Sequence, residues 1–254
     1  MMIDTHTHLY SDAFQDDRPK VIARAQEAGI KKFVIPAIDS SYHRAMYNLE
    51  KRYPGMFLMM GLHPTSVKPE SFEKELQLVR AELKQRKFYA VGEIGIDLYW
   101  EKETLELQKK VFKTQIQMAK KHKLPIVIHC RDAFDEVFEV LETEKDDRLF
   151  GVFHCFTGDY EHAQKALSFN MKLGIGGVVT FKNGKIDRFL NKIPLSELVL
   201  ETDAPYLAPA PYRGKRNESS YLTYVCKKLS EIYQLPETEI ANVTSATATQ
   251  LFQI

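Results

Sequence analysis

Residues 88–129 read FYAVGEIGIDLYWEKETLELQKKVFKTQIQMAKKHKLPIVIH and contain the pattern that decides the fold. The apolar run Phe88–Glu93 is typical of a buried strand, and a second such run follows at Pro125–His129. Between them, Glu103–Lys121 has helical spacing, with apolar residues on one side and lysines on the other. A strand, a helix and a second strand in this order indicate two parallel strands of one sheet.

The same alternation extends along the chain and predicts eight strands. Eight strand–helix units in about 200 residues favour an α/β fold closed into a (β/α)8 TIM barrel. After Pro211 only helices are expected, at Ser219–Tyr233 and from near Pro236, and they would close one side of the barrel as extra C-terminal helices. The remaining predicted strands are Met2–Thr5, Lys32–Pro36, Phe57–Gly61, Phe150–His154, Met171–Ile175 and Leu198–Glu201. The remaining predicted helices are Pro19–Ala28, Tyr42–Arg52, Ser71–Arg86, Phe134–Thr143, Tyr160–Phe169 and Ile186–Asn191.

Length and composition narrow the class of protein. The 254 residues suit one barrel domain spanning 1–254, and no linker divides them. The 35 Lys+Arg and 34 Asp+Glu residues nearly balance, which neither indicates nor excludes a nucleic-acid partner. Three cysteines without CxxC spacing, no signal peptide and no apolar run of about 18 residues predict a cytoplasmic protein without a membrane partner. No segment indicates an obligate protein partner.

Histidines and acids stand where the predicted strands end. In a parallel barrel these ends meet at one face, where barrel enzymes build their sites. His6 and His8, two residues apart after the first strand, are expected to project to the same side. Residues far apart in the sequence therefore meet in the predicted site, which contains His6, His8, His63, Glu93, His129, His154 and Asp203.

Imidazole and carboxylate donors without thiolates suit divalent cations such as Zn²⁺, Mn²⁺ or Mg²⁺. Six ligands are enough for two ions joined by a carboxylate, and such a pair can activate water. Glu201 is expected either to orient a ligand or to be one, or else to form a salt bridge elsewhere. Cys130 and Cys155 directly follow two of the histidines, so they are expected to face away from the site.

Several motifs, in order along nearly the whole chain, resemble those of the TatD-related metal-dependent deoxyribonucleases, a family of the amidohydrolase-like group. These motifs are IDTHTHL, GLHP, VGEIGID, PIVIHCRDA, HCFTG, GIGGVVTFKN, ETDAPYLAP and RGKRNE. The chain departs from them at Tyr10, where Asp or Asn is usual, and in GIDLYW. The resemblance implies a distorted barrel with two divalent ions. It implies one ion held by His6, His8, Glu93 and Asp203 and the other by Glu93, His129 and His154, with Glu93 as the bridge.

The resemblance also implies a metal-dependent hydrolase that cleaves phosphodiester bonds of DNA, of exonuclease type, with single-stranded DNA or DNA ends as substrate. We expect the ions to activate a water molecule, with Asp203 as general base and Glu93 holding both ions. His63 either donates a hydrogen bond to the phosphate or packs against Pro64. The loop cations Arg213, Lys215 and Arg216, together with Arg131, are expected to contact the DNA backbone.

Two other functions stay open at this point. One is an amidase, lactonase or deacylase of the same barrel superfamily. Such enzymes often bridge their metals with a carboxylated lysine, whereas the fourth predicted strand ends in Glu93. The other is a metal-binding protein without catalytic activity, although six ligands leave coordination positions open for water.

Overall fold

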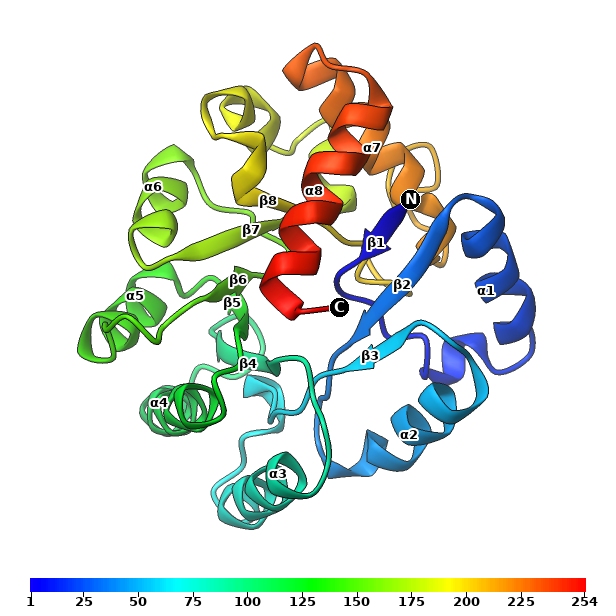
Figure 1. Ribbon diagram of the computed structural model, residues 1–254. Coiled ribbons are helices and arrows are strands. Elements are labelled where there is room, and N and C mark those ends of the chain that lie inside the picture. Colours follow the sequence, from blue (N-terminus) through cyan, green and yellow to red (C-terminus); the bar gives the residue numbers. More distant parts are fainter.

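The computed structural model describes residues 1–254 as a ring of eight strands surrounded by helices (Figure 1). All paired strands run parallel, and all helices except the C-terminal one lie outside the ring. The predicted (β/α)8 TIM-barrel fold is confirmed. The strands are β1 (Met2–Asp4), β2 (Ile30–Ile35), β3 (Met56–Leu58), β4 (Val91–Asp97), β5 (Ile126–Arg131), β6 (Gly151–Phe153), β7 (Met171–Ile175) and β8 (Leu198–Leu200).

The barrel is distorted, because its strands form two separate ladders. One ladder has the order β1-β2-β3 and the other the order β4-β5-β6-β7-β8. Single bridges join them, from Met60 to Val91 on one side and from Thr7 to Ala204 on the other. The two seams therefore lie next to Glu93 and Asp203, whose backbone N–H groups donate to the carbonyls of Ala37 and His6.

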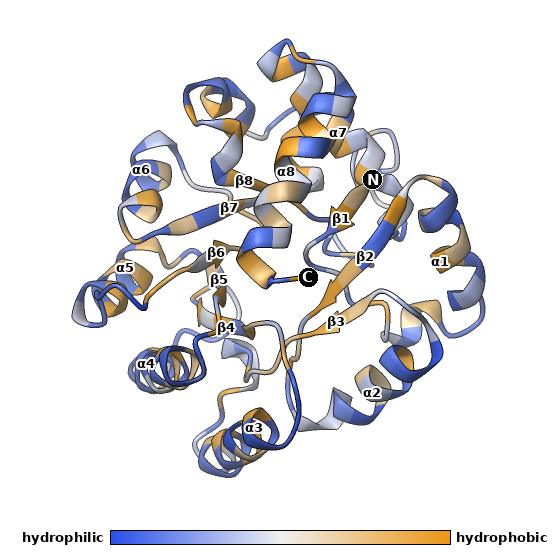
Figure 2. Ribbon diagram, viewed as in Figure 1, coloured by the Kyte–Doolittle hydropathy of each residue, from blue (hydrophilic) through white to orange (hydrophobic).

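The outer helices are amphipathic and cover the ring with their apolar sides. In Figure 2 hydrophobic and hydrophilic residues alternate along them, as the 3.6-residue period requires. None of the helices combines the length and apolar composition that a membrane crossing needs. The α-helices are α1 (Arg18–Glu27), α2 (His43–Arg52), α3 (Phe72–Gln85), α4 (Leu105–His122), α5 (Phe134–Thr143), α6 (Tyr160–Ser168), α7 (Leu222–Tyr233) and α8 (Glu237–Phe252).

The C-terminal helix α8 closes the end of the barrel at which the strands begin (Figure 1). Ser245 donates a hydrogen bond to the carbonyl of Met1, just before β1, and Thr247 donates to that of Ser196, just before β8. Phe252, 2% exposed, belongs to a hydrophobic cluster that contains one apolar residue from each of seven strands or their flanking residues. The opposite end stays open, so a site can form only where the strands finish. The other residues of this cluster are Ile3, Val34, Met59, Ala90, Val127, Val152, Val199, Ala248 and Leu251.

Two predicted elements differ most from the structure. The helix expected at Ile186–Asn191 consists of two three-residue 3₁₀ turns, because a segment this short cannot offset the cost of starting an α-helix. β4 continues past Glu93 to Asp97, because its last residues pair with the end of β5. Glu93 is thus the third residue of its strand, not the last, and the register of the β4–β5 pair is irregular next to it. This irregularity leaves Glu93 directed into the ring.

Candidate metal centre

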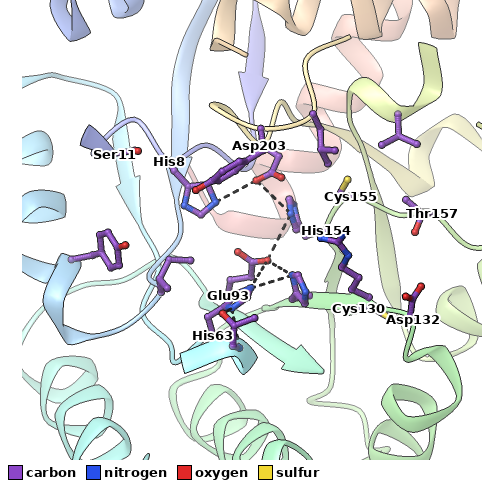
Figure 3. Close-up of a pocket in the computed structure, with 18 of the residues that line it drawn as sticks. His8, Ser11, His63, Glu93, Cys130, Asp132, His154, Cys155, Thr157 and Asp203 are labelled. Carbon is purple, nitrogen blue, oxygen red and sulfur yellow. Dashed lines mark hydrogen bonds and ion pairs between the residues drawn. The ribbon is translucent and has the colours of Figure 1, made fainter. Parts of the chain in front are cut away.

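A cavity of about 490 Å³ lies at the open end of the barrel (Figure 3). Side chains from segments far apart in the sequence form its wall, and the buried His6 lies behind this wall. All seven site residues predicted from the strand ends therefore lie in or next to one cavity. Those in the wall are His8, His63, Glu93, His129, His154 and Asp203.

Glu93 lies at the centre of the histidines. Its Oε2 is 3.2 Å from Nε2 of His6, and its Oε1 is 2.8 Å from Nδ1 of His129. Oε1 also lies 3.5 Å from Nε2 of His63 and 3.8 Å from Nε2 of His154. The two oxygens of one buried carboxylate thus face different imidazoles.

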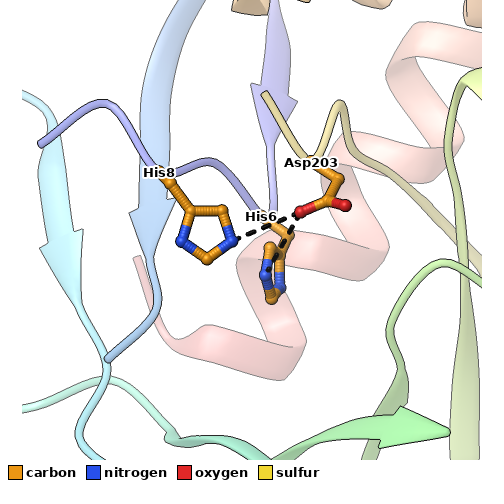
Figure 4. Close-up of side chains that lie close together, drawn as sticks. All are labelled: His6, His8 and Asp203. Carbon is orange, nitrogen blue, oxygen red and sulfur yellow. Dashed lines mark ion pairs between the residues drawn. The ribbon is translucent and has the colours of Figure 1, made fainter. Parts of the chain in front are cut away.

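Asp203 lies close to three of the histidines, His6, His8 and His154. Its Oδ1 lies 3.3 Å from Nε2 of His8 and 3.9 Å from Nε2 of His6 (Figure 4). The same oxygen is 3.7 Å from Nε2 of His154. Asp203 has a positive φ of 56° and its N–H donates to the carbonyl of His6, so the two loops hold each other in place. The expected projection of His6 and His8 to one side is what brings them both to this carboxylate.

The donor atoms fall into three groups whose members lie within 4.8 Å of one another. Glu93 belongs to two of these groups and so does His6. Neither ring nitrogen of His6 has a hydrogen-bond partner, because its close contact with Glu93 lacks hydrogen-bond alignment. A fully buried imidazole without a partner calls for an explanation, and a cation at its free nitrogen supplies one. Nitrogen and oxygen donors also match the preferences of Zn²⁺ and Mn²⁺. The residues present therefore fit divalent metal ions. The three groups are His6, His8 and Asp203; His6, Glu93 and His154; and His63, Glu93 and His129.

Burial and mutual contact set the charges in the cluster. The rings of His6 and His154 stack with centroids 3.4 Å apart, so two positive charges there would repel strongly. Burial, aided by His154, lowers the pKa of His6. Burial also lowers that of His154, but the carboxylates of Glu201, Glu93 and Asp203 outweigh it and raise the pKa to about 10. Burial raises the pKa of Glu93, yet His6 and the other imidazoles hold it well below its usual range. The site thus carries ionised carboxylates that attract cations.

Asp97 is a site residue that sequence reasoning missed. Its Oδ2 is 2.8 Å from Nε2 of His129, and its Oδ1 accepts hydrogen bonds from the backbone N–H groups of Tyr99 and Trp100. Because Nδ1 of His129 faces Glu93, Asp97 holds the nitrogen on the opposite side of the ring, as carboxylates do behind metal-binding histidines. The only sequence signal was the acid in VGEIGID.

Glu201 lies against His154, one of the predicted ligands. Its Oε1 is 2.9 Å from Nδ1 of His154, but the two atoms are not aligned for a hydrogen bond, so we treat Glu201 as a neighbouring negative charge. The same oxygen accepts the N–H of Cys155 at 2.5 Å. A Cβ on Gly174 would come within 2.4 Å of the carboxylate, so only glycine leaves room for Glu201.

The hydrogen bonds of His63 put a proton, and not a lone pair, on the ring nitrogen that faces the cavity. Its Nδ1 accepts the backbone N–H of Thr65 at 3.2 Å and is 2.7 Å from the Thr65 hydroxyl. An imidazole nitrogen that accepts a hydrogen bond carries no proton, so in the neutral ring Nε2 carries it. This Nε2 lies 3.2 Å from Nδ1 of His129 and points into the cavity. His63 therefore presents a donor to the site.

Of the four cationic side chains predicted to bind DNA, only one lines the cavity. Arg131 lines the cavity, and its guanidinium lies 4.0 Å from the ring centroid of Tyr99. Arg213, Lys215 and Arg216 are absent from the cavity wall. Arg216 instead forms two hydrogen bonds with Asp17, at 2.8 and 2.7 Å, and Arg213 lies 3.5 Å over the ring of Phe181. The structure thus brings one of these cations to the site and leaves three outside its wall.

The two cysteines that follow His129 and His154 lie beside the cavity, and Cys130 also packs against the hydrophobic core. Both Cys130 and Cys155 contribute to the cavity wall. Cys155 follows the end of β6 with a positive φ of 44°, so the alternation of a strand does not govern its direction. Cys130 is the penultimate residue of β5, at the edge of the cavity. Burial raises the pKa of the Cys155 thiol well above its usual value, which keeps it a poor metal ligand.

Comparisons with known proteins extend over nearly the whole chain. The sequence model of the TatD related DNase family matches residues 3–253. A Bacillus subtilis (strain 168) protein named uncharacterized metal-dependent hydrolase YabD is 38% identical over 256 residues, covering 100% of both chains. The crystal structure of YjjV, a TatD homolog from Escherichia coli K12, superposes with a TM-score of 0.94 at 30% identity, covering 100% of this chain and 98% of that one. A TatD family hydrolase of Entamoeba histolytica superposes with a TM-score of 0.87 at 21% identity, covering 99% of this chain and 97% of that one, which shows the shared fold.

Proposed function

We propose, from the premise that this chain belongs to the TatD related DNase family of metal-dependent hydrolases, that it cleaves phosphodiester bonds of DNA. The observation that supports the proposal most directly is the position of Glu93. Its Oε2 faces His6 at 3.2 Å and its Oε1 faces His129 at 2.8 Å. A carboxylate whose oxygens face two sets of nitrogen donors is suited to bridge a pair of divalent cations.

The proposed ligand sets are those that the resemblance to the family implies, and all of their residues occur in the three donor groups of the cavity. His6, His8 and Asp203 would hold one ion, His129 and His154 the other, and Glu93 both. When bound, the ions supply Lewis-acid stabilisation of charge on the phosphate and lower the pKa of water.

Asp203 has the properties of a general base. Burial raises its pKa, but His154 and His8 outweigh this effect and lower the pKa, so the carboxylate is ionised near neutral pH. All its contacts with imidazoles are made through Oδ1. Oδ2 is therefore the oxygen that can accept a proton from an attacking water in the cavity.

His63 and Arg131 are suited to hold the substrate. Nε2–H of His63 can donate to a phosphate oxygen, and the Arg131 guanidinium adds a positive charge on the same wall. A cavity of about 490 Å³ has the size of a small-molecule site, which suits one terminal nucleotide better than a duplex. This size favours an exonuclease acting on single-stranded DNA or DNA ends.

The experiment that tests the proposal compares linear and circular single-stranded DNA. The protein is stripped of metal and then assayed with Zn²⁺, Mn²⁺ or Mg²⁺ added singly. We expect hydrolysis of the linear strand only when metal is present, and little of the circle, because an exonuclease needs an end. Ester and amide substrates run in parallel test the amidase, lactonase or deacylase alternative, and metal binding without any turnover would favour a non-catalytic protein.

Two matched variants locate the activity in the cavity. Glu93→Gln removes the charge of the proposed bridge and should lower both metal content and rate, the latter by about 100-fold or more, since even outer-shell changes reach that size. Asp132→Asn makes the same chemical change on the same cavity wall, at an exposed residue without an ion pair, and should leave both unchanged. Full metal content and rate in the Glu93 variant would refute the bridging role.

A further inference from the structure

His8 lies between two tyrosine rings in equivalent orientations. The ring centroids of Tyr10 and Tyr206 are each 5.7 Å from that of His8, and each ring is tilted by 75° to it. Only one of the two makes a polar contact: the Tyr10 hydroxyl lies 2.8 Å from Nδ1 of His8. The two aromatic neighbours therefore differ in chemistry rather than in placement.

The two nitrogens of His8 face different groups. Nε2 faces Asp203, with Oδ1 3.3 Å away (Figure 4). Nδ1, on the other side of the ring, faces Tyr10. A neutral imidazole carries its proton on one nitrogen and a lone pair on the other. If the lone pair is to bind a cation at Nε2, the proton must sit on Nδ1 and needs an acceptor, which the Tyr10 oxygen supplies.

Tyr10 is held firmly enough to determine this arrangement. Its side chain is 4% exposed, and its ring packs 5.5 Å from that of Tyr42. Arg18 anchors the backbone on both sides of it, donating hydrogen bonds to the carbonyls of Leu9 at 2.7 Å, Tyr10 at 3.0 Å and Ser11 at 2.9 Å. A hydroxyl fixed in this way restricts the rotation of the His8 ring and can accept a proton carried by Nδ1.

We propose that Tyr10 is a positioning residue of the metal centre: its hydroxyl accepts the Nδ1–H of His8 and so keeps the Nε2 lone pair directed at the cation position beside Asp203. The inference rests on the proposed function, in which His8 is a metal ligand. It assigns a role to one of the positions at which this chain departs from the family motifs, and it concerns only the ion nearest His8.

The test is a metal titration of three proteins, the wild type, Tyr10→Phe and Tyr206→Phe. Each is stripped of metal and titrated with Zn²⁺ against a chromophoric chelator, which reports affinity without any need for turnover. We expect Tyr10→Phe to weaken one of the two binding steps by about tenfold or more and to leave the other unchanged, the usual effect of losing an outer-shell partner. Tyr206→Phe, which removes a hydroxyl from the equivalent ring, should match the wild type in both steps.

Two further measurements show whether the variants fold and which nitrogen of His8 carries the proton. Thermal unfolding of the metal-free proteins establishes that both variants fold. In the zinc-loaded wild type, nitrogen NMR shifts of the His8 ring should show the proton on Nδ1, which tests the inference even if Tyr10→Phe does not fold.

Equal zinc affinity in Tyr10→Phe and the wild type, or a proton on Nε2 of His8, would overturn the role of Tyr10. A wild type that binds none of Zn²⁺, Mn²⁺ and Mg²⁺ would instead refute the proposed function, so the two failures are distinguishable.

Discussion

Replacing Asp97 by Asn should weaken metal binding, although Asp97 contacts the His129 ring on the side away from Glu93. The Asp97 carboxylate, completely buried, faces three donors: Nε2 of His129 at 2.8 Å and the backbone N–H groups of Tyr99 at 3.0 Å and Trp100 at 2.7 Å. An amide of the same shape has only one oxygen. At least one donor must then face the new NH₂ group, whichever way the amide turns.

The less disruptive orientation keeps the oxygen on the two backbone N–H groups and turns the NH₂ toward His129. Nε2 of His129 must then accept, so its proton moves to Nδ1, the nitrogen that faces Glu93 at 2.8 Å. A protonated Nδ1 cannot bind a cation. Outer-shell changes of this kind cost about 10–100-fold in metal affinity or activity, which corresponds to about 1.4–2.7 kcal/mol. The lost charge-assisted hydrogen bond should lower the free energy of unfolding by about 1.5–3 kcal/mol.

The assay is chelator competition on the metal-stripped protein, followed by hydrolysis of linear single-stranded DNA and by urea unfolding. Asp132→Asn, the same substitution at an exposed position of the cavity wall, is the control and should behave as the wild type. A variant at Asp97 that binds metal and cleaves DNA at the wild-type level would show that the tautomer of His129 does not depend on this carboxylate.

Three other predictions follow from contacts in and around the barrel. His63→Ala should raise KM for DNA and leave metal content unchanged, because Nδ1 of His63 accepts a hydrogen bond from Thr65 and Nε2 carries the proton. Loss of metal from this variant, measured by atomic absorption, would show that His63 is a ligand instead. Burial raises the pKa of Glu218, but the ion pair with Arg24 outweighs burial and lowers the pKa. The ion pair therefore stabilises the fold above about pH 4.3, and this stabilisation is lost as the pH falls through the folded pKa of Glu218. Glu218→Gln should therefore lose less thermal stability than the wild type between about pH 6 and 3, and an identical loss would contradict this. Phe252→Ala, in the plug of the barrel, should cost about 3–5 kcal/mol in urea unfolding, and a change near zero would mean that α8 does not seal the ring.

The sequence predicted most of the barrel because its signals are local. Apolar runs alternating with amphipathic stretches specify strands and helices without reference to the rest of the chain. The segment 186–191 was the exception, since six residues carry a helical pattern but cannot sustain a helix. The end of β4 was also missed, because its extension to Asp97 depends on pairing with the end of β5.

The gathering of the site residues was predictable for a similar reason. Once the strands are parallel, the residues that follow them must meet at one face, and a donor's position along the chain is enough to place it there. The loop cations show where this reasoning stops. Arg216 shares the sequence neighbourhood of Asp203, yet it pairs with Asp17, a residue 199 positions away that no local pattern connects to it.

The amino-acid sequence by itself determined the order of strands and helices and the set of side chains delivered to the open end of the barrel. Only the tertiary structure decided which nitrogen each imidazole turns toward the carboxylates, and which group holds the other nitrogen: Asp97 for His129 and Tyr10 for His8. The physical reason is that periodicity is a property of the backbone within one element. The position of a proton on a ring, in contrast, depends on contacts between side chains that only packing brings together.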